Sequence, residues 1–146
     1  MIEQKIYHKI GELLWKIMPL EAIEISFIGS IYPESYSGGA EWKLENGSIV
    51  SFNLGERPYE IEDEIMILMR KLKEVTSQDW NQYIFSLSNN MDFNIKFAYI
   101  DEEDSWPNLY MKGISDLTKE EAEEYYIPEE IWEERVRLKQ ERMKQA

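Results

Sequence analysis

The first twenty residues carry apolar side chains at steps of three and four. The stripe consists of Ile6, Ile10, Leu13, Leu14 and Ile17. This spacing predicts a helix with one buried face, and Pro19 ends it because proline lacks the N–H that a further turn needs. His8 falls on the polar side of this helix, so we expect a solvated surface histidine.

A second helix is predicted over residues 58–75. Its first turns are acidic and its last turns are basic, which complements the helix dipole at both ends, and proline is common at a helix start. Its apolar stripe consists of Ile61, Ile65, Leu68, Met69, Leu72 and Val75. Both helices therefore offer one apolar face for a sheet.

Alternation of apolar and polar residues predicts five strands. The first is centred on residues 23–27, and the second and third flank Asn46 and Gly47. Asn-Gly favours a type I′ hairpin turn because both residues tolerate positive φ. Residues 32–39, which include a proline and two adjacent glycines, are expected to form a loop.

The fourth and fifth strands are predicted at residues 82–88 and 93–100, joined by a polar turn. Their aromatic side chains are expected to pack in the core, because a sheet that stacks RNA bases needs surrounding basic residues and this hairpin has only Lys96. No nucleic-acid partner is expected.

The C-terminal third is predicted to be helical. Thr118 and Glu121 form a capping-box pattern that opens a short helix, and Pro128 starts a last one. This helix is almost wholly polar after Leu138, so residues 139–146 are expected to fray or protrude as a helical tail.

These elements predict one α+β domain over residues 1–146. We expect a five-stranded, mainly antiparallel sheet packed on one face by two helices, followed by the C-terminal helices. The helix at residues 58–75 links the third and fourth strands, so a right-handed crossover between parallel neighbours stays open, and with it a mixed sheet.

Composition narrows the chemistry. The chain has 29 acidic and 16 basic residues, a formal net charge of −13, no cysteine and one histidine. This excludes disulfides, thiolate catalysis and cysteine- or multi-histidine metal centres. The negative charge repels nucleic acid and anionic membranes and favours a basic partner, although it can equally serve solubility alone. With no apolar signal or membrane span apparent, we expect a cytoplasmic protein.

Two acidic runs beside aromatic residues are the candidate partner-binding residues. The favoured run is Asp101, Glu102, Glu103 and Asp104 with Trp106 and Tyr110, and the second is Glu120, Glu121 and Glu124 with Tyr125. Carboxylates complement a basic surface, and aromatic side chains supply the buried area that exposed charges lack. A solvated surface is the alternative for each run.

The chain resembles the YezG-like immunity proteins, antitoxins of polymorphic nuclease toxins in bacterial competition. The resemblance lies in IYHKIGELLWKIMP, in residues 61–75 followed by Trp80, in the hairpin YIFSLSNNMDFNIKFAYID, and in Ile131-Trp132-Glu133. It implies an antitoxin that binds and neutralises a cognate, basic nuclease toxin by covering its active-site groove, with no catalytic residue, cofactor or metal of its own.

Two other functions remain open. One is an acidic protein–protein adaptor or nucleic-acid mimic without a toxin partner. The other is an enzyme that uses carboxylates with Mg²⁺ or Ca²⁺. Against the enzyme, four contiguous acids on a loop cannot converge on one ion, and neither Lys nor His is placed beside them as a partner.

Overall fold

The computed structural model describes residues 2–145. Its helices and strands are α1 (Ile2–Ile17), β1 (Ala22–Tyr32), β2 (Ser35–Leu44), β3 (Ile49–Ser51), α2 (Tyr59–Thr76), β4 (Gln82–Ser88), β5 (Phe93–Ala98), α3 (Lys119–Glu124) and α4 (Glu129–Gln145). Short 3-10 turns η1 (Leu54–Glu56), η2 (Glu102–Asp104) and η3 (Ile114–Asp116) connect them.

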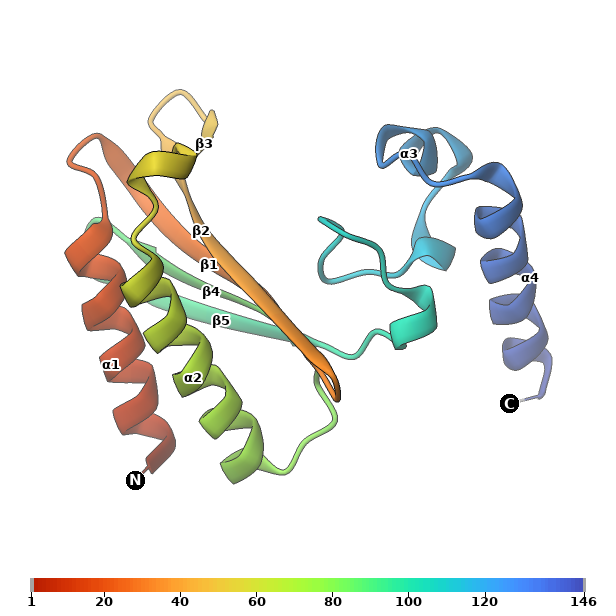
Figure 1. The fold of residues 1–146 in the computed structure, drawn as a ribbon, viewed down its shortest axis with the longest axis horizontal. Helices are drawn as coiled ribbons and strands as arrows, with labels where there is room; N and C mark the ends of the chain where they lie inside the picture. The colour runs from red at the N-terminus through yellow and green to blue at the C-terminus, as the bar shows by residue number, and fades with distance from the viewer. Residues whose placement is uncertain (1, 146) are drawn as a thin grey trace.

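The five strands form one sheet in the order β3-β2-β1-β4-β5, and every neighbouring pair is antiparallel. Helices α1 and α2 lie side by side over one face of it (Figure 1). The predicted α+β fold is thus confirmed. The parallel crossover does not occur, because the chain after α2 returns beside β1 and leaves β1 and β2 between β3 and β4.

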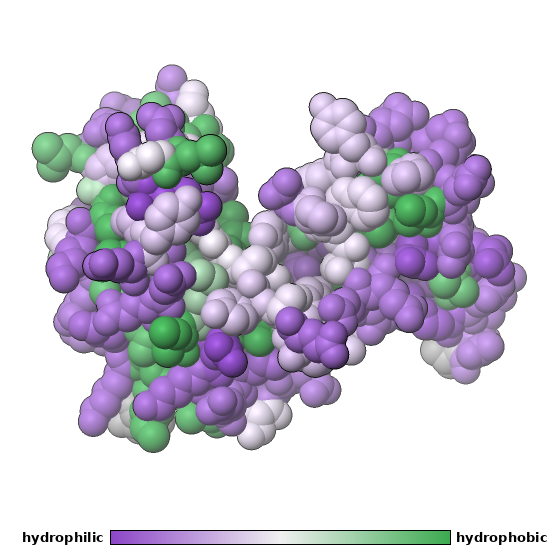
Figure 2. Space-filling view, viewed as in Figure 1, coloured by the Kyte–Doolittle hydropathy of each residue, from purple (hydrophilic) through white to green (hydrophobic). Residues whose placement is uncertain are grey.

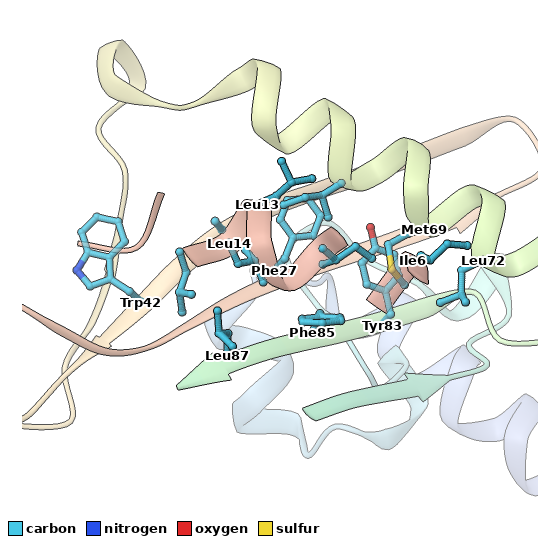
Figure 3. Close-up of a cluster of buried hydrophobic side chains, with 14 of the residues drawn as sticks. Ile6, Leu13, Leu14, Phe27, Trp42, Met69, Leu72, Tyr83, Phe85 and Leu87 are labelled. Atoms are coloured by element: carbon cyan, nitrogen blue, oxygen red, sulfur yellow. The ribbon is translucent and has the colours of Figure 1, made fainter. Parts of the chain in front are cut away.

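The main core fills the space between the helix pair and the sheet. Fully buried side chains from both layers meet there, including Leu14, Phe27, Met69, Tyr83 and Phe85 (Figure 3). Both predicted helical stripes supply this core, whereas Val75 at the end of the second is exposed. His8 lies on the surface beside Glu12, as predicted.

The segment predicted as a loop, residues 32–39, is instead a tight hairpin. β1 continues to Tyr32, the turn contains only Pro33 and Glu34, and β2 begins at Ser35. Both glycines of this segment, Gly38 and Gly39, belong to β2, and Gly38 makes room for a core ring because a Cβ there would lie 2.6 Å from the Phe27 ring. Gly29 of β1 does the same for Tyr83, whose hydroxyl would lie 2.3 Å from its Cβ.

Three smaller differences are local. A bulge between Ala22 and Glu24 buries Ala22 and leaves Ile23 half-buried, so Ile23 does not share the buried positions of Ile25 and Phe27. β3 is short, and exposed Leu54 lies beyond it in η1. At the Asn-Gly turn only the glycine has positive φ, so the turn is not type I′.

The turn is a three-residue loop closed by paired backbone hydrogen bonds. The Gly47 N–H donates to the Leu44 carbonyl and the Leu44 N–H donates to the Ser48 carbonyl. This is the arrangement of a type I turn followed by a left-handed glycine. The hairpin is therefore as predicted, with one more loop residue than the type I′ turn allows.

The C-terminal third forms a smaller second core beyond the sheet (Figure 1). Its buried members are Leu109, Ile114, Leu117, Ala122 and Ile127. The capping box at Thr118 is present as predicted. The expected frayed tail is helical through Gln145 and is tied down by the pairs Lys139–Asp116 and Arg142–Asp101, while Ala146 lies outside the described residues.

The glycine positions allow a test of the packing. We expect Gly29→Ala to destabilise the protein by at least about 2 kcal/mol, since the added methyl group would overlap the Tyr83 ring and the Ser37 carbonyl. Gly11→Ala in α1 is the matched control: its Cβ meets open space, and alanine should add about 0.5–1 kcal/mol of helix stability. Urea unfolding of both variants measures the difference, and equal stabilities would contradict the packing.

Candidate partner-binding surface

The favoured acidic run lies where the chain leaves the sheet, and two of its four carboxylates hold the chain together. Asp104, 9% exposed, accepts hydrogen bonds from the Ser115 N–H (3.0 Å) and the Ser115 hydroxyl (2.6 Å). Asp101 accepts from the Arg142 guanidinium at 2.6 Å. Both side chains therefore join η2 to later segments, and neither is a free carboxylate.

The aromatic residues of this run also make internal contacts. The Trp106 indole packs on the second core and donates its N–H to the Tyr125 carbonyl at 2.9 Å. The Tyr110 hydroxyl lies 3.2 Å from the Ser37 hydroxyl of β2. Trp106 thus anchors the C-terminal segment to itself, and Tyr110 connects it to the sheet.

Of the second run, Glu121 is the structural member. It accepts the Thr118 N–H at 2.9 Å, while its own N–H donates to the Thr118 hydroxyl. The hydrogen bond from the Thr118 N–H lowers the pKa of Glu121, with help from the Thr118 side chain and Lys112. Glu120 and Glu124 remain exposed, and Tyr125 is half-buried.

The exposed acids of α3 and α4 are one of the groups of carboxylates that the fold leaves available, and α1 and α2 carry another. We define the acidic helix pair as Glu120, Glu123, Glu124, Glu130 and Glu133, which are exposed and have no ion pair within residues 2–145. The hydrogen bond from Lys119 to Glu129 raises the pKa of Lys119, and Glu123 and Glu133 raise it further. Acids of both helices thus share one neighbourhood.

An exposed tyrosine separates the two helices. The N–H groups of Tyr126 and Ile127 donate to the Glu123 and Ala122 carbonyls, the Schellman arrangement that ends α3. Tyr126 occupies the left-handed position usually taken by glycine, with φ 60°, and its side chain is 89% exposed. Sequence reasoning missed it, because the position follows from where the helix ends.

A groove separates the sheet from the C-terminal segment and is visible as a notch between the two parts of the molecule (Figure 2). Its volume is about 660 Å³. It is lined by Ser37, Gly39, Glu41, Arg57, Tyr110 and Tyr125, among others. Two predicted residues, Tyr110 and Tyr125, thus line one groove. No pattern in the sequence predicted that β2 would lie opposite them.

The remaining members of the favoured run lie elsewhere. Glu102 lines a different hollow of about 920 Å³ that also contains Arg70 and Lys73 of α2. Glu103 is exposed, and its backbone carbonyl accepts from Arg135. The structure thus brings Asp101, Glu103 and Asp104 together in one hollow beside α4, whereas Glu102 lines a separate one.

A buried ion pair closes one wall of the groove. The Arg57 guanidinium bonds both oxygens of Glu62, at 3.0 and 3.1 Å, and the same carboxylate accepts the Ala40 N–H of β2. Glu62 is 1% exposed, and its hydrogen bond raises the pKa of Arg57. The sequence indicated only a helix-dipole role for the acids of this turn.

Comparison with known proteins adds no assignment. The sequence matches no protein-family model and no curated protein sequence. The resemblance to YezG-like immunity proteins therefore stays a prediction. Within residues 2–145, no helix is both long and apolar enough to cross a membrane, and no three His, Asp or Glu side chains are grouped to hold a metal ion.

A substitution at Asp104 tests whether its carboxylate stabilises the fold. We expect Asp104→Ala to cost about 2 kcal/mol, since two partly buried donors of Ser115 lose their acceptor and a buried carboxylate is removed from its site. Glu103→Ala, one residue away and exposed, should change the free energy of unfolding by less than about 0.5 kcal/mol. Thermal or urea unfolding distinguishes them, and a neutral Asp104→Ala would return this carboxylate to the candidate surface.

Proposed function

We propose that this chain is an immunity-type binding protein that neutralises a basic protein, a nuclease toxin, by occupying its positive surface. The observation that carries the proposal is the acidic helix pair: five exposed carboxylates with no ion-pair partner among residues 2–145, on a C-terminal segment that is bonded to the sheet. Such a surface attracts a positive groove at long range and excludes a phosphate backbone from it. The inhibitor needs no chemistry of its own.

Tyr126 supplies the apolar contact area that the exposed charges lack. Exposed ion pairs contribute little affinity, and interfaces gain most of theirs from a few well-packed side chains, among which tyrosine is frequent. Trp106 offers less free surface for this role because its ring is partly buried against the second core. Tyr126 is exposed, lies between Glu123 and Glu130 in sequence, and occupies a backbone position that fold stability alone would assign to glycine.

The acidic helix pair is tested by neutralisation. The partner to use is the product of the adjacent reading frame, expressed as a toxin. Replacing Glu120, Glu123, Glu124, Glu130 and Glu133 with Gln should weaken binding at least about tenfold, mainly through slower association, and should reduce its salt dependence. Growth protection on co-expression should fall in parallel.

A control variant keeps the total charge equal. It changes Glu3, Glu60, Glu64 and Glu74 to Gln and Asp63 to Asn. These five acids are exposed and lie on α1 and α2. Both variants lose the same formal charge, so a difference between them reports position. Equal affinities for the two variants, or an adjacent product that is neither bound nor toxic, would contradict the proposal.

Tyr126 is tested by comparing stability with binding. Tyr126→Gly should raise the free energy of unfolding by roughly 0.5–1 kcal/mol, because glycine adopts positive φ without strain. The same variant should bind the toxin at least about tenfold more weakly. Tyr126→Ala keeps the backbone strain and removes the ring, so it should lose affinity without gaining stability. Unchanged affinity in both variants would remove Tyr126 from the interface.

A further inference from the structure

The two edges of the sheet differ in how well they are protected from pairing with another strand. On one edge β3 is only three residues long, and the β2 N–H of Ala40 beyond it is bonded by the buried Glu62 carboxylate. On the other edge β5 pairs regularly with β4 over six residues. β5 has no proline and no bulge, and no segment among residues 2–145 pairs with its outer side. Natural sheets usually protect such an edge.

The ladder fixes which backbone groups of β5 are free. The Ser88 N–H donates to the Asp92 carbonyl, so the even-numbered residues of β5 direct their N–H and C=O groups toward β4. Phe93, Ile95 and Phe97 therefore direct theirs away from the sheet. No hydrogen bond to these outward groups occurs within the described part of the chain. They form a template for one more antiparallel strand.

The side chains of this edge complement a second copy of the same strand. Asp92, Asn94 and Lys96 line one hollow on the uncovered face of the sheet, all three are exposed, and neither charge has an ion-pair partner within residues 2–145. When two β5 strands pair antiparallel about an axis through Asn94, each Asp92 lies directly opposite the other copy's Lys96. The symmetry makes this contact twice.

The same register also brings apolar side chains together on the face of the sheet that the helices cover. It places Phe93 opposite Ile95 of the second copy, again twice. The Phe93 ring stacks on Phe85 yet is 53% exposed, so half of its apolar surface is open to a neighbour. One register thus satisfies the outward backbone groups, pairs both charges and covers an aromatic ring.

We propose that two copies of this chain associate through β5 into a continuous ten-stranded sheet, with Asp92 of each copy against Lys96 of the other. The occupant of this edge is a second copy because one segment carries both members of the charge pair in a two-fold register. The inference does not depend on the proposed function, since it uses residues of β5 and its turn and none of the acids of α3 and α4.

The test is a charge exchange measured by sedimentation equilibrium over a wide concentration range at physiological salt. The natural protein should show a concentration-dependent dimer. Lys96→Glu and Asp92→Lys should each weaken it at least about tenfold, because each substitution places like charges together twice. The double variant Asp92→Lys with Lys96→Glu restores opposite charges and should return the dissociation constant to within about threefold of the natural value.

For Asp92→Lys, an effect of net charge and an effect of the proposed contact would change the dimer affinity in opposite directions. Asp92→Lys makes each copy less negative than −13, so general repulsion would strengthen association in this variant, whereas the proposed contact weakens it. Asn94→Lys, which puts two lysines at the axis, separates the two effects in the same way. All these positions are exposed, so melting temperatures should stay close to that of the natural protein.

A monomer at every concentration would overturn the proposal. So would a stronger dimer in Asp92→Lys, or a double variant that stays as weak as the single ones. A dimer that none of these substitutions affects would place the contact elsewhere on the molecule and would equally reject this edge.

Discussion

The arrangement of this protein depends on Asn81, the residue just before β4. Its amide bonds both backbone groups of Ile100, donating to the carbonyl and accepting the N–H at 2.8 Å each. Its own N–H donates to Ala98, and its carbonyl accepts the Ile31 N–H of β1. One buried side chain thus fixes the start of β4, the end of β5 and the exit of the chain toward its C-terminal segment. Buried polar groups without such partners would cost several kcal/mol.

Gln82 extends this junction by one residue. The side-chain NH2 group of Gln82 donates to the Tyr32 hydroxyl at 3.0 Å, and that hydroxyl donates to the Ile100 carbonyl. The side-chain oxygen of Gln82 accepts the Met111 N–H. Burial raises the pKa of Tyr32, so the hydroxyl stays neutral and keeps its proton to donate. Because these bonds are directional, the second core is held at a defined position beside β2, and the groove between them follows from that position.

The sequence predicted the helices and strands far better than it predicted the contacts between them. Periodicity found both helical stripes and all five strands, since these signals are local. It failed at Gly38, which makes room for the Phe27 ring of the neighbouring strand, and at Glu62, whose carboxylate accepts a backbone N–H at the edge of β2. It also could not separate Asp104 from Glu103. Both are acids in one run, and only the position of Ser115 makes the first structural and leaves the second exposed.

The acidic composition therefore has more than one physical meaning along this chain. Asp101, Asp104, Glu62 and Glu121 are bonded within the molecule, and their charges are part of the fold. The five acids of the acidic helix pair have no ion-pair partner within residues 2–145, and they flank Tyr126, whose backbone is strained and whose ring is exposed. Solubility is served by charge anywhere on the surface. The strained, exposed ring of Tyr126 adds an apolar surface to that charge, and the proposed binding surface rests on this combination.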